Sequence, residues 1–251
     1  MTTASSTLRI AVAATALALG PLRAEAQVAL APSDGRFWAG AAALLGTAFL
    51  FDAGISSAAS RNTHTSLARF ADALQPLGRQ GVVVPALAAT LAASWAVGGW
   101  RPARAVLRIA AGYAAGDLLM SALKPAIGRH RPDSAGGDPW RFEPFAGGDQ
   151  WHSMPSAHAT HIFSLAEGIA DEVRVPAIRV AAYGVAALVG WQRIAFRGHW
   201  PSDVVAGGVL GVAAAGTTGR WLRGGPLRDG ARGAARLMVT PNALFISAEL
   251  P

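Results

Sequence analysis

Apolar residues along this chain gather in six long segments that shorter polar stretches separate. Ala and Gly dominate the segments, and their length suits a helix better than a strand. Small residues let helices pack closely in a membrane, although an Ala-rich soluble bundle shows the same pattern. The predicted helices cover residues 37–53, 81–99, 103–123, 157–172, 176–195 and 203–222.

None of these segments is a clean, charge-free run of twenty residues: Arg108 and Asp117 interrupt the third, and Glu167 interrupts the fourth. In lipid such side chains face the bundle interior, whereas in a soluble bundle they lie on the wet face. We predict an all-α, six-helix transmembrane bundle, with one short amphipathic helix within residues 54–80. The C-terminal "RLMVTPNALFISAEL" has two β-prone runs around Pro-Asn, which predicts a small hairpin.

The N-terminus has the pattern of an export signal. Arg9 precedes the apolar run "IAVAATALALG", and "AEA" at 24–26 offers a small-x-small cleavage pattern. A disordered or amphipathic N-terminal arm is the alternative. The predicted organisation is therefore a signal peptide or arm at 1–26, a helical-bundle domain at 36–223 and a basic tail at 224–251.

Composition agrees with a membrane protein that handles anions. Charged residues make up 15% of the chain, against about 25% in an average soluble domain. The net charge of +7 favours anionic lipid or an anionic substrate. Nucleic acid is not expected, because the Arg residues lie between apolar segments and not on a polar helix or an aromatic-basic sheet. The absence of Cys excludes disulfides, thiolate metal sites and a Cys nucleophile.

Three polar clusters fall at the ends of predicted helices. The first is Lys124, six residues, then Arg131-Pro132, just past the third helix. Lys and Arg both suit phosphate oxygens, but basic residues at helix ends also serve as dipole partners or lipid anchors. Arg129 and His130 lie between them, and we interpret them as widening the positive field.

The second cluster is "SMPSAHAT", at the start of the fourth helix. Ser153 is the predicted cap, and the free N–H groups near Ser156 and Ala157 would then point at an anion. His158 lies in that first turn. Taken alone, the pattern also fits an ordinary cap with a surface histidine.

The third cluster is "RIAFRGHWPSDVVAG", in which Arg193 ends the fifth helix and His199 lies in a turn. Asp203 can reach back to His199 across one helical turn. A carboxylate bonded to one imidazole nitrogen raises the basicity of the other, so this His suits a nucleophile or general base. A His/Asp capping pair is the alternative.

A bundle brings all three clusters to the same end. Three cations and helix-end amides can hold a phosphate there, while two histidines supply a nucleophile and an acid. No metal-ligand set accompanies them, so we expect neither a metal nor another cofactor.

Together, Lys-x6-Arg-Pro, Pro-Ser-x-His and Arg-x5-His-x3-Asp resemble the type 2 phosphatidic acid phosphatase superfamily. The resemblance covers about residues 37–222 and is sharpest over 124–207. It implies that Lys124, Arg131 and Arg193 bind phosphate oxygens, with added hydrogen bonds from Ser156 and the Ala157 amide.

The resemblance also implies the catalytic roles. His199 would attack phosphorus, Asp203 would orient His199, and His158 would protonate the leaving group and then activate water. The family usually has Gly where this chain has Ala157 and Ser where it has Gln192. His152 and His161 have no family role, and we interpret them as structural.

The expected function is metal-independent hydrolysis of a phosphate monoester or lipid pyrophosphate through a phosphohistidine. The partners would be a phosphorylated lipid or small phosphoester and the membrane lipids. Alternatives are a soluble periplasmic acid phosphatase, a vanadate-dependent haloperoxidase or an inactive lipid-binding member. Positive charge between the predicted helices favours the inner membrane, with the active site facing the periplasm.

Overall fold

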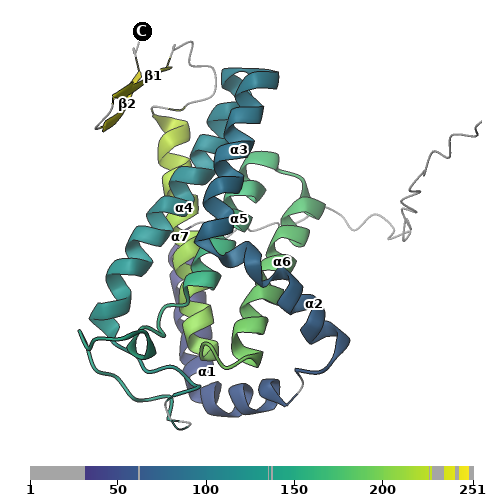
Figure 1. Cartoon of the computed structure of the whole chain (residues 1–251), viewed down its shortest axis with the longest axis vertical. Helices are drawn as coiled ribbons and strands as arrows, with labels where there is room; N and C mark the ends of the chain where they lie inside the picture. The colour runs from purple at the N-terminus through teal and green to yellow at the C-terminus, as the bar shows by residue number, and fades with distance from the viewer. Residues whose placement is uncertain are drawn as a thin grey trace, which may run out of the picture.

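A computed structural model gives the fold of the chain and describes residues 32–61, 63–134, 136, 138–225, 227, 235–240 and 243–248. The predicted signal peptide at 1–26 lies outside these residues. Figure 1 shows the long helices side by side, with a wrapped loop across one end. The helices are α1 (Gly35–Ser60), α2 (Ser66–Leu74), η1 (Gln75–Gly78), α3 (Gln80–Gly98), α4 (Trp100–Ile127), η2 (Asp149–Trp151), α5 (Ala157–Val173), α6 (Pro176–Ala195) and α7 (Pro201–Gly224).

The predicted all-α bundle is confirmed. The six apolar segments correspond to α1, α3, α4, α5, α6 and α7, and α2 is the short helix expected within 54–80. Strands β1 (Ala235–Thr240) and β2 (Ala243–Ala248) pair antiparallel where the sequence predicts a hairpin. The largest boundary difference is in α1, which continues to Ser60 and not only to residue 53. Helix α4 continues to Ile127, so that Lys124 lies in its last turn and not beyond it.

Helix ends follow ordinary capping chemistry. Asp34 and Thr65 each accept a backbone N–H at the starts of α1 and α2. Pro176 and Pro201 occupy first helical positions, where a missing N–H costs nothing. Gly128 ends α4 in the left-handed region that glycine tolerates best.

Helix α5 lies at the centre of the bundle and packs against α4, α6 and α7. Its contact with α7 depends on two glycines one turn apart. A Cβ on Gly207 would lie 2.5 Å from the carbonyl oxygen of Ser156, and one on Gly211 would overlap that of Thr160. The small residues therefore let the two backbones approach closely, as in membrane helix pairs.

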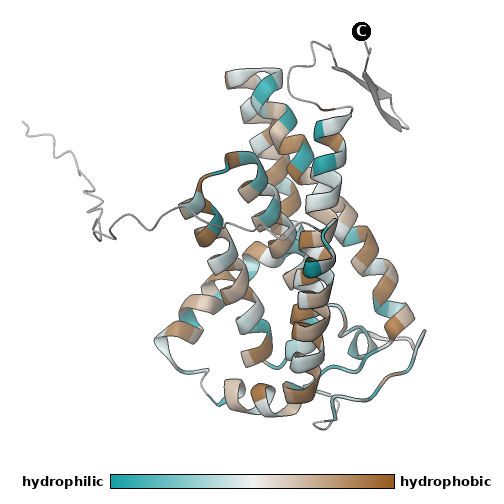
Figure 2. Cartoon of the chain, turned by 180° about the vertical axis from the view of Figure 1, so that it is seen from behind, coloured by the Kyte–Doolittle hydropathy of each residue, from teal (hydrophilic) through white to brown (hydrophobic). Residues whose placement is uncertain are grey.

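Within the part of the chain that the structure describes, three helices, α1, α3 and α4, are long and apolar enough to cross a membrane. Their outward faces carry large apolar side chains that no described residue covers, such as Leu50, Val97 and Leu118. Figure 2 shows the brown hydrophobic positions along the length of these helices. The chain is therefore a membrane protein.

Two of the three charges named within the third and fourth predicted helices, Arg108 and Glu167, face the interior, whereas Asp117 is partly exposed and lies 2.7 Å from Nε2 of His161. Arg108 of α4 is buried and bonds Glu172 of α5 through two nitrogens, at 2.8 and 2.6 Å. Glu167 accepts a 2.6 Å hydrogen bond from Tyr183 of α6. These pairs connect α4, α5 and α6 away from the three motif clusters.

Candidate active site

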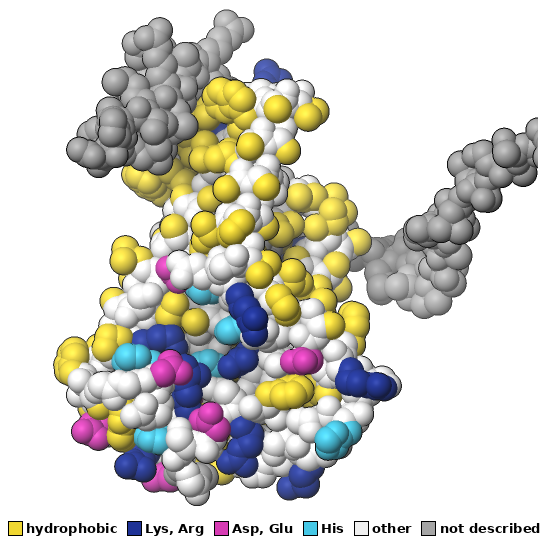
Figure 3. Space-filling view, viewed as in Figure 1, with side chains coloured by type: hydrophobic (Ala, Val, Ile, Leu, Met, Phe, Trp, Pro, Cys, Tyr) yellow, Lys and Arg dark blue, Asp and Glu magenta, His cyan; other side chains and the backbone are white. Residues whose placement is uncertain are grey.

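The three sequence clusters meet at one end of the bundle, where α4 and α6 end and α5 and α7 begin. Figure 3 shows Lys, Arg and His side chains gathered over this lower half, beneath a mainly hydrophobic upper half. Lys124 lies within electrostatic range of Arg131 and Arg193. Three mutually repelling cations at one place indicate a site for an anion.

Hydrogen bonds to backbone carbonyl oxygens hold two of these cations in position. Lys124 Nζ donates to the His152 carbonyl at 2.6 Å, and Arg131 Nη1 donates to the Gly198 carbonyl at 2.9 Å. Arg131 Nη1 also lies 3.3 Å from Nε2 of His199. An anion held by Arg131 would thus lie beside this ring nitrogen.

Of the three cations, Arg193 has a buried hydrogen-bond donor that is left unpaired by the described residues. Its Nε is buried and has no hydrogen-bond partner among the described residues. A buried N–H donor is normally paired, so the missing partner is consistent with a ligand that completes the site.

One carboxylate already contacts the cations. Arg131 donates to the Asp149 side chain at 3.0 Å, and the Asp149 side chain is 84% exposed. Burial on its own raises the pKa of Asp149, but the charge and hydrogen bond of Arg131 outweigh it and hold the pKa below its usual range. Asp149 therefore remains ionised and competes with any bound anion for Arg131.

His199 lies in the turn between α6 and α7 and is 2% exposed. Burial lowers its pKa to about 3; the charges of Lys124 and Arg131 act in the same direction, and the Asp203 carboxylate opposes them. The ring is therefore neutral at ordinary pH, with a lone pair available on one nitrogen.

Asp203 is the nearest carboxylate to His199. Its Oδ2 lies 3.7 Å from His199 Nδ1, which is longer than a hydrogen bond. The same oxygen accepts from Ser153 Oγ at 2.5 Å and from the Trp200 N–H at 2.8 Å. Asp203 is thus fixed by other donors, with His199 Nδ1 facing it.

Arg129 does not widen the positive field, contrary to the sequence-based interpretation. It is fully buried, and its Nη1 donates to Asp203 at 2.8 Å while its Nη2 donates to Asp52 of α1 at 2.6 Å. Asp52 also accepts from the N–H and Oγ of Ser202 at 2.8 and 2.6 Å. A buried carboxylate–guanidinium–carboxylate network therefore lies behind His199.

His130, which we grouped with Arg129, is also buried. Its ring packs edge-on against Trp151, and its carbonyl oxygen accepts from the Trp200 indole N–H at 2.9 Å. His130 is therefore part of the support for the turn that carries His199.

The start of α5 differs from the expected cap. Ser156, and not Ser153, is the N-cap residue, because Ser153 Oγ is bonded to Asp203. The Ser156 N–H donates to the Asp203 carbonyl at 2.9 Å, so it is not free for an anion. The Ala157 N–H has no acceptor among the described residues and remains a candidate donor.

His158 lies in the first turn of α5, where burial, together with the charges of Arg193 and His199, lowers its pKa to about 3. Its Nε2 lies 2.8 Å from the side-chain amide of Gln75 in η1. Nothing in the motif pattern indicates this neighbour, which is 83 residues away in sequence.

Gln192, which stands where the family usually has Ser, also faces the α2–η1 segment. Its amide donates to Asp72 of α2 at 3.0 Å. The substitution thus gives α6 a direct contact with α2, next to Arg193.

The described residues contain no group of three or more His, Asp or Glu side chains arranged to hold a metal ion. The donors at this end are cations and amides, which suit an anion. These donors are the groups that would bind an anion at this end of the bundle.

Comparison with known proteins decides the family, since residues 105–224 match the sequence model of the PAP2 superfamily. This part of the chain belongs to the PAP2 superfamily. The match includes all three motif clusters, and it confirms the resemblance to type 2 phosphatidic acid phosphatases.

Curated relatives include the lipid A 1-phosphatase of Rhizobium johnstonii, which is 38% identical over 96 residues. The lipid A 1-phosphatase of Rhizobium etli is 38% identical over 95 residues. Each alignment covers 38% of this chain, and they cover 38% and 40% of the two relatives. The similarity therefore spans well under half the length of either relative.

Solved structures confirm the fold. The transmembrane PAP2-type phosphatidylglycerolphosphate phosphatase of Bacillus subtilis has a TM-score of 0.57 at 20% identity, over 76% of this chain and 94% of that one. LpxE of Aquifex aeolicus has a TM-score of 0.54 at 20% identity, over 67% and 94%.

Proposed function

We propose that this chain is a metal-independent lipid phosphate phosphatase that acts through a phosphohistidine. The observation that carries the proposal is the position of His199. Its ring is buried and neutral, and Nε2 lies 3.3 Å from Arg131 within the group of three cations. A nucleophilic nitrogen beside an anion-binding guanidinium is the arrangement that attack on a phosphate requires.

In the first step, Lys124, Arg131 and Arg193 hold the phosphate oxygens. Nε2 of His199 forms a bond to phosphorus as the bond to the ester oxygen breaks. His158, which takes up a proton when the negative charge of the substrate lies beside it, gives that proton to the ester oxygen, so the product leaves as an alcohol. Asp203 favours the proton on Nδ1 of His199 and stabilises the positive charge that develops on the ring.

In the second step, water attacks the phosphohistidine. His158, now neutral, takes a proton from the water as its oxygen bonds to phosphorus. The nitrogen–phosphorus bond breaks, inorganic phosphate is released and both histidines return to their starting forms. The three cations stabilise the extra negative charge in both transition states.

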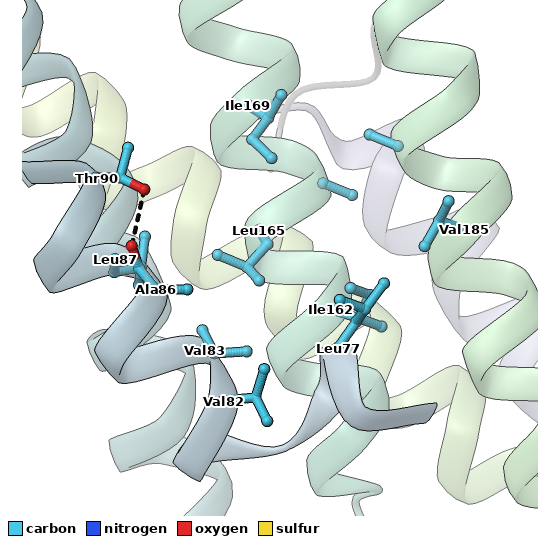
Figure 4. Close-up of a pocket in the computed structure, with 12 residues that line it drawn as sticks. Leu77, Val82, Val83, Ala86, Leu87, Thr90, Ile162, Leu165, Ile169 and Val185 are labelled. Carbon is cyan, nitrogen blue, oxygen red and sulfur yellow. Dashed lines mark hydrogen bonds between the residues drawn. The ribbon is translucent and has the colours of Figure 1, made fainter. Parts of the chain in front are cut away.

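An apolar groove supports a lipid substrate. It lies beside α5, with a volume of about 340 Å³, and Figure 4 shows its aliphatic side chains converging from η1, α3, α5 and α6. Ile162 lines it one helical turn after His158. Thr90, its polar member, donates to the Ala86 carbonyl at 2.7 Å, so the lining remains apolar. We assign this groove to a hydrocarbon chain of the substrate.

The lipid A 1-phosphatases among the relatives make lipid A 1-phosphate the first candidate within this class. Phosphatidic acid, phosphatidylglycerol phosphate and undecaprenyl pyrophosphate present a terminal phosphate in the same way. The three cations and the Ala157 N–H would bind only the phosphate group, so contacts with the rest of the substrate would distinguish these lipids.

The proposed orientation places this site on the periplasmic face of the inner membrane. The connections at the opposite end are short, with α3 and α4 joined at Gly99 and α5 and α6 at 174–175. Basic residues flank them, namely Arg101, Arg104, Arg174 and Arg179. Positive charge beside short connections marks the cytoplasmic side. Alkaline phosphatase activity of a reporter fused after Pro251 would contradict this orientation.

A substrate panel tests the proposed function. Purified protein in detergent should release phosphate from at least one of the four lipids, and His199→Ala should abolish that release. Release only from small soluble esters would favour a soluble-type acid phosphatase. Release that is unchanged in His199→Ala would overturn the mechanism.

A further inference from the structure

Residues 66–78, which form α2 and η1, pack against the start of α5 beside the catalytic end. Within this segment Gln75 is 7% exposed, and its amide nitrogen Nε2 is placed 2.8 Å from Nε2 of His158. A buried amide is seldom left unpaired. The steps proposed above for His158 make no use of this contact.

The α2–η1 segment is fastened at several points, so Gln75 is held in place. The Gly78 carbonyl oxygen lies 2.9 Å from Nδ1 of His161, and Asp72 accepts from Gln192 at 3.0 Å. Gly78 also packs directly on the catalytic ring, since a Cβ there would lie 2.9 Å from Cδ2 of His158. Only glycine permits this approach, and it brings η1 within hydrogen-bonding reach of the ring.

The geometry points to Gln75 as a positioning residue for His158, and this inference rests on the proposed function. We propose that the Gln75 amide adopts the orientation half a turn from the one placed, so that its carbonyl, and not its NH2 group, faces His158 and accepts the Nε2 proton. The other ring nitrogen, Nδ1, is then the atom that exchanges a proton with the ester oxygen and with water.

The amide suits this role because it can turn. A half-turn about its last bond exchanges the NH2 group and the carbonyl oxygen. A carbonyl acceptor serves both forms of His158, since Nε2 keeps its proton while Nδ1 gives one up and takes one back. An NH2 group facing Nε2 would instead need a lone pair there and would oppose the protonated ring.

The charges around His158 come from several elements. They are Arg193 of α6, His199 of the α6–α7 turn, His161 of α5 and Arg79 between η1 and α3. Burial opposes a proton on His158 most strongly, and these groups, which are cationic or become so on protonation, act in the same direction. Gln75 is the neutral neighbour that can favour the protonated ring through a hydrogen bond.

Two substitutions of similar size change this neighbour in opposite ways. Gln75→Glu places a negative charge beside Nε2 and stabilises the protonated ring. Gln75→Leu removes the acceptor and destabilises it. Because the general acid must be protonated before the first step, the basic limb of the kcat/KM profile reports its protonation.

The experiment measures kcat/KM against pH for phenyl phosphate and p-nitrophenyl phosphate with purified full-length protein in detergent. The basic limb should move up by about 1 pH unit in Gln75→Glu and down in Gln75→Leu. Gln75→Leu should lower kcat/KM about 10- to 100-fold for phenyl phosphate, part of what general acid catalysis supplies. The loss should be smaller for p-nitrophenyl phosphate, whose better leaving group needs less protonation.

Gln80→Leu is the matched control, because Gln80 is exposed, follows the same segment and does not contact His158. It should keep the wild-type profile. Thermal unfolding checks that each variant is folded. Equal losses in both Gln75 variants with an unmoved basic limb would show a purely structural role and overturn the inference.

His158→Asn separates this inference from the function on which it rests. If His158→Asn keeps wild-type turnover and profile, then the proposed mechanism fails. If His158→Asn abolishes turnover while the Gln75 variants leave the basic limb in place, then only the role of Gln75 fails.

Discussion

Removing the Asp52 carboxylate tests whether the buried network behind His199 holds the catalytic end together. Asp52 is fully buried and accepts hydrogen bonds of 2.8, 2.6 and 2.6 Å from Ser202 N–H, Ser202 Oγ and Arg129 Nη2. Arg129 is fully buried as well, so loss of Asp52 leaves its charge with Asp203 as the remaining carboxylate partner.

The structure sets the scale of the effect. Breaking a buried ion pair by removing one partner costs about 3 to 5 kcal/mol, because an uncompensated charge remains in the interior. For a chain of this size 1 kcal/mol corresponds to about 2 to 4 °C in Tm, so Asp52→Ala should lower Tm by about 6 to 20 °C. Asp52→Asn should cost less, since it keeps one oxygen acceptor. Arg129→Met should cost at least as much as Asp52→Ala, because it strands two carboxylates.

The assay is thermal unfolding in detergent, followed by tryptophan fluorescence, with turnover measured beside it. Glu143→Gln is the control, since Glu143 is exposed and its side chain makes no hydrogen bond with a described residue. Turnover should fall in Asp52→Ala, because Arg129 then acts on Asp203 alone. A Tm within 2 °C of wild type, at full turnover, would refute the reasoning.

Three further predictions concern the site itself. Asp149→Asn should lower KM about 1.4- to 5-fold, the value of one exposed ion pair, because Asp149 competes for Arg131; steady-state kinetics with p-nitrophenyl phosphate would show it, and a raised KM would contradict it. The folded-state pKa of His199, about 3, lies below its unfolded value of about 6.5, so the free energy of unfolding should fall as pH falls through this window. Chemical unfolding at several pH values measures the free energy of unfolding against pH, and this dependence should be shallower in His199→Asn. An unchanged dependence would contradict the low pKa of His199. Turnover should survive EDTA and be inhibited by vanadate, which resembles the five-coordinate transition state; activity lost in EDTA and restored by Mg²⁺ would contradict the metal-independent site.

The sequence predicted what local spacing encodes. The apolar segments predicted the six long helices. The four-residue interval between His199 and Asp203 predicted that the two side chains face each other across one turn. Lys124, Arg131 and Arg193 could be grouped because each falls at a helix end, and alternating helices bring those ends together.

The missed residues depend on contacts that the fold alone creates. Asp52 meets Arg129 across 77 positions and Gln75 meets His158 across 83. Arg129 looks like one more cation in a basic run, and only its burial shows that it serves Asp203. Ser153 was predicted to cap α5, but the helix begins after Ser156, and Ser153 is left to bond Asp203.

Direct detection of a phosphoryl group on His199 tests the central claim most directly. The protein would be mixed with p-nitrophenyl phosphate and quenched in alkaline detergent, because a nitrogen–phosphorus bond is labile in acid. Trypsin would then release the peptide 198–220, which contains His199, for mass spectrometry. We predict one phosphoryl group on His199 in the wild-type protein and none on this peptide in His199→Ala. A phosphoryl group on another residue, or turnover that persists in His199→Ala, would contradict the account.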